Sequence, residues 1–372
     1  MSTTSFWLKE PYDGLPSPRL EGRADVAVIG GGVTGCSCAL TLAERGVRVR
    51  LYEQREIAGG ASGRNGGFAL RGAAMPYDEA RRALGAERAR LVMTLTERTL
   101  DRLEELAGDA FRRVGSLRLA ADDEERAALR REHDALRADG FAVEWVEDLD
   151  PPLDRLYRGA ILHPDDGALS PARWVRRLAE HAARAGAEVR EGEATTVEEV
   201  EADVVVVACD GYTRALLPEL PVQPTRGQVV ATEPLRERLY ERPHYARGGY
   251  DYWQQLPDGQ LVLGGNRDVS LATEETDVEE TTHAIQGALD ALVERLAGYR
   301  PRITDRWAGI WGTTPDRIPL VGQVRDSVWV AGGYSGHGNA LGLACGDLVA
   351  RAVLGEAPPE LDVFAPARLT TA

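Results

Sequence analysis

The stretch Gly30-Gly31-Gly32-Val33-Thr34-Gly35 decides the fold of this chain. An apolar, β-branched run over residues 25–29 precedes it, and residues 36–45 continue with a helical pattern. A second apolar run over residues 47–52 then ends in Glu53. Because strand, glycine turn, helix and strand follow one another in this order, they predict one βαβ unit of an α/β domain.

The spacing of the glycines indicates what this turn binds. Gly30 permits the tight turn, Gly32 lets a pyrophosphate approach the backbone, and Gly35 lets the helix pack close to the strand. The free N–H groups at the start of the helix then face the phosphates, so Val33 joins the predicted binding residues. Glu53 stands where an acidic side chain holds the ribose 2′-OH of a dinucleotide. The alternative, a glycine-rich turn without a ligand, leaves the spaced glycines and Glu53 unexplained.

Length, charge and cysteine spacing exclude several classes of function. A chain of 372 residues can bury a large core and form two domains. The formal net charge of −15 argues against nucleic acid and anionic membranes as partners, because both bind basic surfaces. The N-terminus shows no secretory signal and no apolar run approaches bilayer length, so we expect a cytoplasmic protein without membrane contact. The four cysteines lack metal-ligand spacing, and no metal site is predicted.

The rest of the chain changes pattern several times. A glycine-rich loop occupies residues 58–67, and charged helical patterns cover residues 77–106 and 124–138. The run of valines within residues 203–208 suits a parallel strand buried on both faces. Residues 222–266 alternate short apolar stretches with turns, which predicts an antiparallel sheet. Further helices are predicted over 171–184, 281–296 and 340–354.

Several motifs together resemble one known family over nearly the whole chain. Beside the opening glycine turn with Glu53, they are Gly60-Ala61-Ser62-Gly63-Arg64-Asn65-Gly66-Gly67, Thr225-Arg226-Gly227-Gln228-Val229, Trp307-Ala308-Gly309-Ile310-Trp311-Gly312 and Gly333-Tyr334-Ser335-Gly336-His337-Gly338. In these residues the chain resembles the D-amino-acid oxidase superfamily of FAD-dependent oxidoreductases, and within it the gamma-glutamylputrescine oxidase-like branch.

The resemblance implies an FAD-binding domain that is Rossmann-like (glutathione-reductase-like), with an antiparallel-sheet α+β substrate domain inserted into it. On this division the FAD-binding domain takes residues 20–80, 151–215 and 302–372, and the substrate domain takes residues 81–150 and 216–301. Some relatives carry the flavin on a cysteine just before the Trp311 region. The matching positions here are Gly309 and Ile310, so we expect non-covalent FAD.

The resemblance also implies which residues line the flavin. One loop runs beside the isoalloxazine ring; its predicted binding residues are Ser62, Arg64, Asn65, Gly66 and Gly67. A second loop lies at the pyrimidine edge of the ring, with Gly333, Gly336, His337, Gly338 and Asn339. The final helix points its N-terminus at flavin N1 and C2=O, where its dipole stabilises the negative charge of the reduced ring.

The reaction implied by the resemblance is the oxidation of a C–N bond. A hydride passes from the carbon beside nitrogen to flavin N5, and the resulting imine hydrolyses. Where amino-acid oxidases of the superfamily carry an arginine for the substrate carboxylate, this chain has Trp311, which can face a cationic or apolar group. Tyr250, Tyr252 and Trp253, on the predicted antiparallel sheet, can add to an aromatic wall. We therefore expect a primary or secondary amine as substrate, with His337, Trp311, Tyr252 and Arg226 as the candidate catalytic residues.

Alternatives stay open at this point. The substrate can instead be a small amino acid such as glycine, proline or an N-methyl amino acid, with Arg226 or Arg317 holding its carboxylate. The aromatic side chains can be ordinary core residues, and only one of the alternating faces around Tyr252 can line a pocket. A nicotinamide dehydrogenase is a third reading. The sequence leaves open whether oxygen or another electron acceptor reoxidises the flavin, and how many chains assemble.

Overall fold

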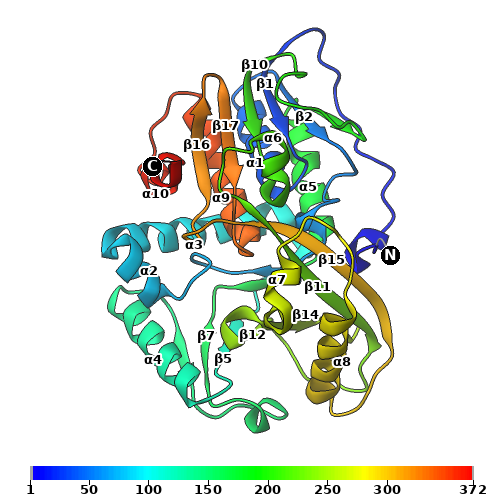
Figure 1. Ribbon diagram of the computed structural model, residues 1–372, viewed down its shortest axis with the longest axis vertical. Helices are drawn as coiled ribbons and strands as arrows, with labels where there is room; N and C mark the ends of the chain where they lie inside the picture. Colours follow the sequence, from blue (N-terminus) through cyan, green and yellow to red (C-terminus); the bar gives the residue numbers. More distant parts are fainter. Residues whose placement is uncertain (1–2, 371–372) are drawn as a thin grey trace.

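The computed structural model describes residues 3–370, and two large sheets organise them (Figure 1). The first sheet has six strands, and its neighbouring strands are parallel except at one edge, where β16 runs antiparallel to β17. Its strands are, in spatial order, β16 (Leu320–Arg325), β17 (Val328–Gly332), β10 (Ala202–Val207), β1 (Ala24–Ile29), β2 (Val49–Glu53) and β9 (Glu188–Glu191). The predicted βαβ unit is therefore present and lies at the centre of this sheet.

Helices cover the parallel sheet. α1 (Val33–Glu44) packs between α5 (Pro171–Arg184) and α9 (Gly338–Val353), and α3 (Ala86–Ala107) contacts both α5 and α9. Because α1 has neighbours on several sides, its side chains from Val33 to Leu40 are buried, including the small residues Gly35 and Cys36. The helix begins at Val33, three residues earlier than the sequence pattern indicated.

The second sheet has eight strands and lies below the first in Figure 1. Its neighbouring strands are antiparallel except for the pair β12 and β5, which is parallel. In spatial order they are β15 (Ile303–Thr313), β11 (Gln223–Pro234), β14 (Gln260–Gly265), β13 (Asp251–Gln255), β12 (His244–Ala246), β5 (Ser116–Leu119), β7 (Ala160–His163) and β6 (Glu144–Val146). The antiparallel sheet predicted from residues 222–266 forms its central strands.

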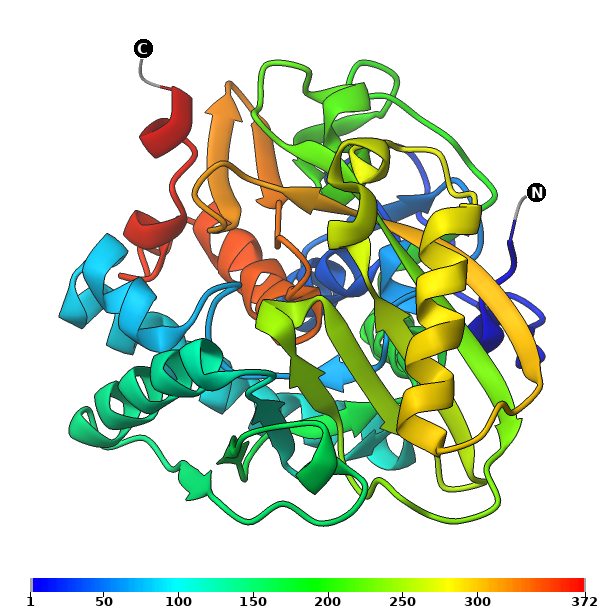
Figure 2. The same ribbon diagram turned by 60° about the horizontal axis from the view of Figure 1, so that its bottom comes forward.

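One face of the eight-stranded sheet is covered by α8 (His283–Ala297), which lies across the strands in Figure 2. Val230, Trp253 and Leu263 from the sheet form a core with Ile285 and Leu289 of the helix, and all are at most 1 % exposed. The opposite face is turned toward the parallel sheet. Because side chains alternate along a strand, successive residues of β11, β13 and β15 point in turn toward α8 and toward the parallel sheet.

The helices predicted over residues 77–106 and 124–138 differ in outcome. The second is α4 (Asp123–Ala138), as expected. The first is two helices, α2 (Tyr77–Leu84) and α3, because Gly85 adopts φ +84° and interrupts the helical backbone. A three-stranded sheet of β3 (Phe68–Ala69), β8 (Gly167–Leu169) and β4 (Phe111–Arg112) lies near these helices, and the shorter elements include α6 (Thr213–Leu216), α7 (Leu271–Glu274), α10 (Leu361–Phe364) and α11 (Ala367–Thr370).

Strand pairing shows where the two sheets exchange chain segments. β7 falls within the segment 151–215, which was assigned to the FAD-binding domain, yet it pairs with β5 of the eight-stranded sheet. β15 falls within 302–372 and pairs along its length with β11. Both segments therefore supply strands to both sheets: β7, β9 and β10 come from the first, and β15, β16 and β17 from the second.

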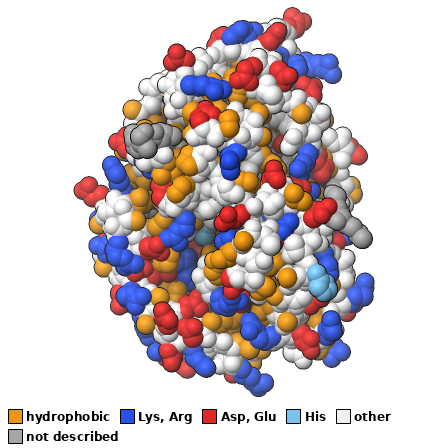
Figure 3. All heavy atoms as spheres, viewed as in Figure 1, with side chains coloured by type: hydrophobic (Ala, Val, Ile, Leu, Met, Phe, Trp, Pro, Cys, Tyr) orange, Lys and Arg blue, Asp and Glu red, His pale blue; other side chains and the backbone are white. Residues whose placement is uncertain are grey.

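The described part of the chain carries mixed charge on its surface. Acidic and basic side chains alternate over the face drawn in Figure 3. None of the helices within residues 3–370 is both long and apolar enough to cross a bilayer. In the same range, His, Cys, Asp and Glu side chains form no group suited to hold a metal ion.

Candidate functional site

A cavity of about 480 Å³ lies between the two sheets, within the range of ~300–1,000 Å³ typical of ligand sites. It begins at the carboxyl ends of β1, β2 and β10 and continues along the inner face of the eight-stranded sheet. This is the edge of a parallel sheet at which ligands bind. Of the predicted site residues, Gly30, Gly32, Val33, Glu53, Ser62, Arg64, Asn65, Gly66, Tyr252, Trp311, Gly336, His337, Gly338 and Asn339 line it.

The glycines of the opening turn are required by close contacts. Gly30 has φ +116°, and a Cβ at this position would overlap the carbonyl oxygen of Ala208. A Cβ at Gly35 would overlap the carbonyl oxygen of Gly30, so Gly35 supports the wall without lining it. A Cβ at Gly32 would stand 2.8 Å from the Ser62 hydroxyl, inside the space that faces the cavity. A side chain at Gly30 or Gly35 would displace backbone, and one at Gly32 would displace the Ser62 side chain.

The start of α1 opens onto this cavity. Gly32 is the N-cap and supplies no side-chain hydrogen bond. Ser62 of the glycine-rich loop supplies a side-chain acceptor instead: the Val33 N–H donates to Ser62 Oγ at 3.0 Å. A helix N-terminus with glycines on its approach offers backbone N–H groups and a positive dipole to an anion.

Glu53 ends β2 at the same side of the cavity and is 9 % exposed. Its Oε2 accepts from the Gly31 N–H at 2.7 Å, and its Oε1 accepts from the Arg55 N–H at 2.8 Å. Burial raises the pKa of Glu53 above its usual value, while the two N–H groups oppose that shift. The carboxylate is thereby fixed in position at the cavity wall.

The glycine-rich loop is held in place by its own side chains. Arg64 donates to the carbonyl oxygens of Gly59 at 2.8 Å, Thr3 at 2.8 Å and Ala308 at 3.2 Å, and burial lowers the pKa of its guanidinium. The Asn65 amide donates to Ala61 O and Ser62 O. These contacts give Arg64 and Asn65 the role of ordering the loop.

Two glycines of this loop make room for the opposite sheet. A Cβ at Gly66 would stand 2.9 Å from the ring of Tyr252. Gly67 has φ +78° and contacts the Gln254 amide. That amide donates to Gly66 O at 2.7 Å and to Gly67 O at 3.0 Å. Gly67 does not line the cavity, and its place is set by this contact.

The inner face of the eight-stranded sheet brings aromatic rings to the cavity. Tyr252 pairs with Tyr245 across β12 and β13, and Trp311 comes from β15. A Cβ at Gly227 of β11 would overlap the Trp311 ring, so the glycine accommodates the indole. The alternation left open in the sequence is settled here, because Tyr252 lines the cavity while Trp253 is fully buried against α8.

Arg226 corrects the sequence-based expectation, because it does not line the cavity. It neighbours Gly227 along β11 and therefore points to the opposite face. There its guanidinium makes two hydrogen bonds to Glu274, at 2.7 and 3.0 Å, and donates to Thr273 O and Val278 O. With Arg226 5 % and Glu274 0 % exposed, the pair is a buried ion pair that holds α7 to the sheet.

His337 is the N-cap of α9 and lines the cavity. Its ring meets the Tyr245 ring edge-on at 6.1 Å. Burial, with smaller contributions from Arg118 and Arg317, lowers the pKa of His337 to about 4, so the imidazole is neutral at pH 7. Its Nδ1 is buried and has no hydrogen-bond partner among residues 3–370.

Asp210 follows β10 and was missed by the sequence analysis. Its carboxylate accepts the N–H groups of Gly312 at 3.0 Å, Gly333 at 2.8 Å and Tyr334 at 3.3 Å. It thereby ties β15 to the loop before α9. Gly333 does not line the cavity and serves this contact. The available signal was the Asp210-Gly211 pair, separated from the valine run only by Ala208-Cys209.

The other missed residues belong to the aromatic end of the cavity. Tyr245 and Arg267 line it beside Tyr250, which the sequence had suggested, and Arg317, first considered as a carboxylate partner, also lines it and pairs with Glu79. Arg267 lies directly after Gly264-Gly265-Asn266, a turn signal at the end of a strand. That signal marks the residue as being at a sheet edge but says nothing of what it faces.

The residues present fit FAD. A glycine cradle and the N-terminus of α1 stand at one end of the cavity, where they suit a pyrophosphate. The N-terminus of α9 and the unpartnered Nδ1 of His337 stand at the other end, where they suit the polar edge of a flavin. One elongated site thus carries two separate sets of polar groups that have no ligand within the protein itself.

Comparison with known proteins agrees with this geometry. The family described as FAD dependent oxidoreductase (DAO) matches residues 25–352. The chain is 32 % identical to the probable oxidoreductase OrdL of Rhizobium meliloti, over 92 % of this chain and 85 % of that protein. It is 29 % identical to the gamma-glutamylputrescine oxidoreductase of Escherichia coli, over 92 % of this chain and 86 % of that one.

Among solved structures, glycine oxidase from Geobacillus kaustophilus superposes with a TM-score of 0.77 at 24 % identity, covering 93 % of this chain and 99 % of that one. At this identity the likeness confirms the fold, an α/β FAD-binding fold with an antiparallel sheet. The extent of the family match confirms the family expected from the motifs. The chain belongs to the DAO family of FAD-dependent oxidoreductases.

Proposed function

We propose that this protein oxidises the C–N bond of a primary or secondary amine to an imine, which then hydrolyses. FAD supplies the hydride acceptor for such a reaction when it is bound. The gamma-glutamylputrescine oxidoreductase and glycine oxidases among its relatives support a nitrogen-bearing substrate. What carries the proposal is the composition of the aromatic end of the cavity: aromatic rings, two guanidinium groups and a neutral histidine, with no free carboxylate.

The carboxylates that line the cavity lie elsewhere or are engaged. Glu53 and Glu193 belong to the end near α1, where the Glu193 N–H donates to Glu53 O. Asp210 is occupied by three backbone N–H groups. The aromatic end therefore offers no carboxylate as a general base. Oxidation of an amine that binds in its neutral form needs none, because the nitrogen lone pair assists loss of the hydride.

The surroundings favour a neutral amine. Desolvation between Tyr245, Tyr252 and Trp311 lowers the pKa of a bound ammonium, and the positive charges of Arg267 and Arg317 lower it further. His337 stays neutral because its pKa is about 4, so its imidazole does not add a charge at pH 7.

We further propose that the flavin is bound without a covalent link. Among residues 3–370, Cys209 is the cysteine that lines the cavity. Its thiol donates to Ile29 O at 3.2 Å, and burial raises its pKa to about 12. A thiol with so high a pKa supplies little thiolate, the form that would attack a flavin.

A small amino acid is a second candidate substrate, favoured by one observation. Arg267 places a cation at the aromatic end of the cavity, and a substrate carboxylate pairs readily with a guanidinium. Arg226, which the sequence suggested for this task, is excluded by its burial on the other face. The two candidates differ in whether the oxidised amine also carries an anionic group.

The test is an anaerobic reduction screen of the purified holoprotein. Primary amines, secondary amines, polyamines and small amino acids are added separately, and bleaching of the visible flavin absorbance is followed; air is then admitted. We expect bleaching by at least one nitrogen compound, with ammonia or an amine released with the carbonyl product. A protein that takes up no FAD, or a flavin that no amine or amino acid reduces, contradicts the proposal.

A further inference from the structure

Arg267 occupies a distinctive position at the aromatic end of the cavity. It directly follows β14, where Gly265 with φ +122° and Asn266 with φ +54° turn the chain back toward the cavity. Its guanidinium carbon lies 5.6 Å from the centre of the Tyr250 ring and 5.8 Å from that of Trp311. The two rings restrict where the guanidinium can move and therefore pre-organise it.

The positive charge of Arg267 has no carboxylate partner within residues 3–370. The cavity is lined by four arginines, and three of them have carboxylate partners: Arg55 and Arg64 pair with Glu279, and Arg317 pairs with Glu79. Arg267 is half-buried and makes neither an ion pair nor a hydrogen bond within residues 3–370. A half-buried guanidinium with free donors is a binding site for an anion.

We propose that Arg267 binds an anionic group of the substrate, a carboxylate in the first instance, and so determines which amines are oxidised. The inference rests on the proposed function, since it names the substrate class of the same site. The guanidinium presents two parallel N–H groups, which match the two oxygens of a carboxylate. The substrate then carries an amine and an anionic group in one molecule.

This assignment changes the role expected of Trp311. The sequence suggested that its indole faces a cationic substrate group, but that side of the ring is taken by Arg267. Trp311 is thus a positioning residue, which supports the cation that contacts substrate. A simple diamine, which carries positive charge only, is disfavoured because the unpaired charge of Arg267 repels it.

The experiment uses equilibrium binding to the holoprotein. Two probe pairs, acetate with acetamide and benzoate with benzamide, differ in charge at nearly constant shape. Binding is followed by perturbation of the visible flavin spectrum and by titration calorimetry. We expect the carboxylates to bind the wild type, and Arg267→Gln to weaken them more than about tenfold while the affinity for the amides stays unchanged. Arg267→Lys keeps a charge and is expected to retain part of the affinity.

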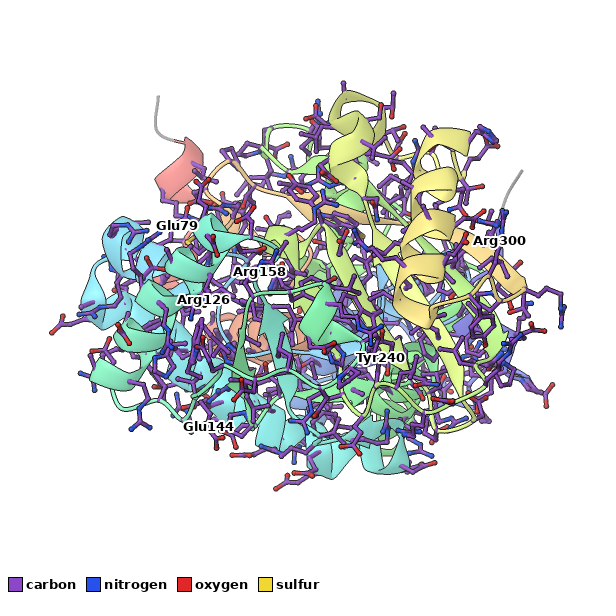
Figure 4. The ribbon with its side chains drawn as sticks, turned by 90° about the horizontal axis from the view of Figure 1, so that it is seen from below. Glu79, Arg126, Glu144, Arg158, Tyr240 and Arg300 are labelled. Atoms are coloured by element: carbon purple, nitrogen blue, oxygen red, sulfur yellow. The ribbon has the colours of Figure 1, made fainter. Side chains whose placement is uncertain are left out.

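Two control variants separate Arg267 from other cations. Arg317→Gln removes the neighbouring cavity guanidinium that is already paired with Glu79 and should leave carboxylate affinity largely intact. Arg300→Gln removes an exposed arginine on the loop after α8, on the opposite side of the molecule from Glu79 in Figure 4. FAD content of each variant is measured alongside, because a misfolded variant loses the cofactor.

The inference is overturned if the wild type binds neither carboxylate, if Arg267→Gln binds them as the wild type does, or if Arg317→Gln loses as much affinity as Arg267→Gln. Its failure is distinguishable from failure of the proposed function, because probe binding requires no turnover. Carboxylate binding that depends on Arg267 in a protein whose flavin no amine reduces would keep the anion site and reject the reaction. Reduction of the flavin by uncharged amines, in a protein that binds no carboxylate, would keep the proposed reaction and reject the anion site.

Discussion

Removing the charge of Glu274 should loosen one segment of the molecule, residues 266–282, which borders the cavity through Arg267. Glu274 is fully buried and accepts both hydrogen bonds from Arg226, at 2.7 and 3.0 Å, together with two from the Gln228 amide at 3.1 and 3.0 Å. Glu274→Gln leaves the guanidinium of Arg226 buried without its counter-charge. Breaking one side of a buried pair costs ~3–5 kcal/mol.

We expect the lower end of this range. Arg226 keeps two carbonyl partners, Thr273 O at 2.9 Å and Val278 O at 3.2 Å, which offset part of the loss. Because the pair anchors residues 266–282 to β11, the cost should appear as local opening of that segment. A cost of about 3 kcal/mol raises the open population about a hundredfold.

Limited proteolysis with thermolysin measures this population, because the enzyme cleaves before large apolar residues. Val269, Leu271 and Val278 are 53 %, 43 % and 48 % exposed, so their side chains are accessible and only the held backbone protects the bonds. Cleavage in this segment, located by mass spectrometry, should be about a hundred times faster in Glu274→Gln. The wild type and the Glu275→Gln variant serve as references.

The double variant Arg226→Gln/Glu274→Gln distinguishes a structural pair from a substrate-binding arginine. Removal of both charges leaves neither buried alone, so cleavage should return toward the wild-type rate. The reasoning is refuted if Glu274→Gln is cleaved at the wild-type rate. It is also refuted if the double variant is restored in stability yet raises the KM for carboxylate substrates, since Arg226 would then serve the substrate.

Three further predictions concern the glycine turn, the loop beside it and His337. Gly35→Ala should abolish soluble FAD-containing protein, because the added Cβ overlaps Gly30 O. Gly287→Ala, in open space on α8, should instead stabilise the fold by up to about 1 kcal/mol and raise the midpoint of thermal unfolding. Equal behaviour of the two variants in thermal unfolding contradicts the packing argument. Glu279→Gln should speed FAD release about tenfold, because Glu279 pairs with Arg55 and Arg64 and so fixes the glycine-rich loop beside the cavity; dialysis with FAD fluorescence measures the loss, and unchanged or slower release contradicts this role. The pKa of His337 in the folded state, about 4, lies below its value in the unfolded chain. The wild type should therefore lose stability relative to His337→Asn as the pH falls from about 6.5 toward 4, by about 2 kcal/mol at pH 4.5. A difference in unfolding midpoint that does not change with pH contradicts this prediction.

Local sequence predicted the elements that hold one end of the site. The glycines at 30, 32 and 35 are required by contacts made within the turn or with the adjacent strand, so their spacing alone carries the information. The β-branched runs of β1 and β10 are buried on both faces and read as strands without knowledge of their partners. The FAD family could be recognised for the same reason, since its motifs are short and contiguous.

The other end of the site depends on long-range pairing. β11 is buried on both faces, so its pattern did not show whether Arg226 or Gly227 faces the cavity. Pairing with β15 decides it: Gly227 lies opposite Gly309, more than 80 residues away along the chain. A Cβ at Gly227 would meet the Trp311 ring, and one at Gly309 would meet Arg64 of the glycine-rich loop. The helix break at Gly85 was missed because a single glycine interrupts a helical pattern only when the tertiary fold turns the chain there.

The sequence by itself thus determined the glycine turn of the βαβ unit and the family to which the chain belongs, because both follow from backbone sterics and motifs over a few neighbouring residues. Only the tertiary structure decided which side chains line the other end of the cavity. It buried Arg226 against Glu274 and brought Arg267 over Trp311. The physical reason is that strand register and sheet twist, which come from packing across the whole molecule, determine which side chain of an alternating strand reaches the cavity.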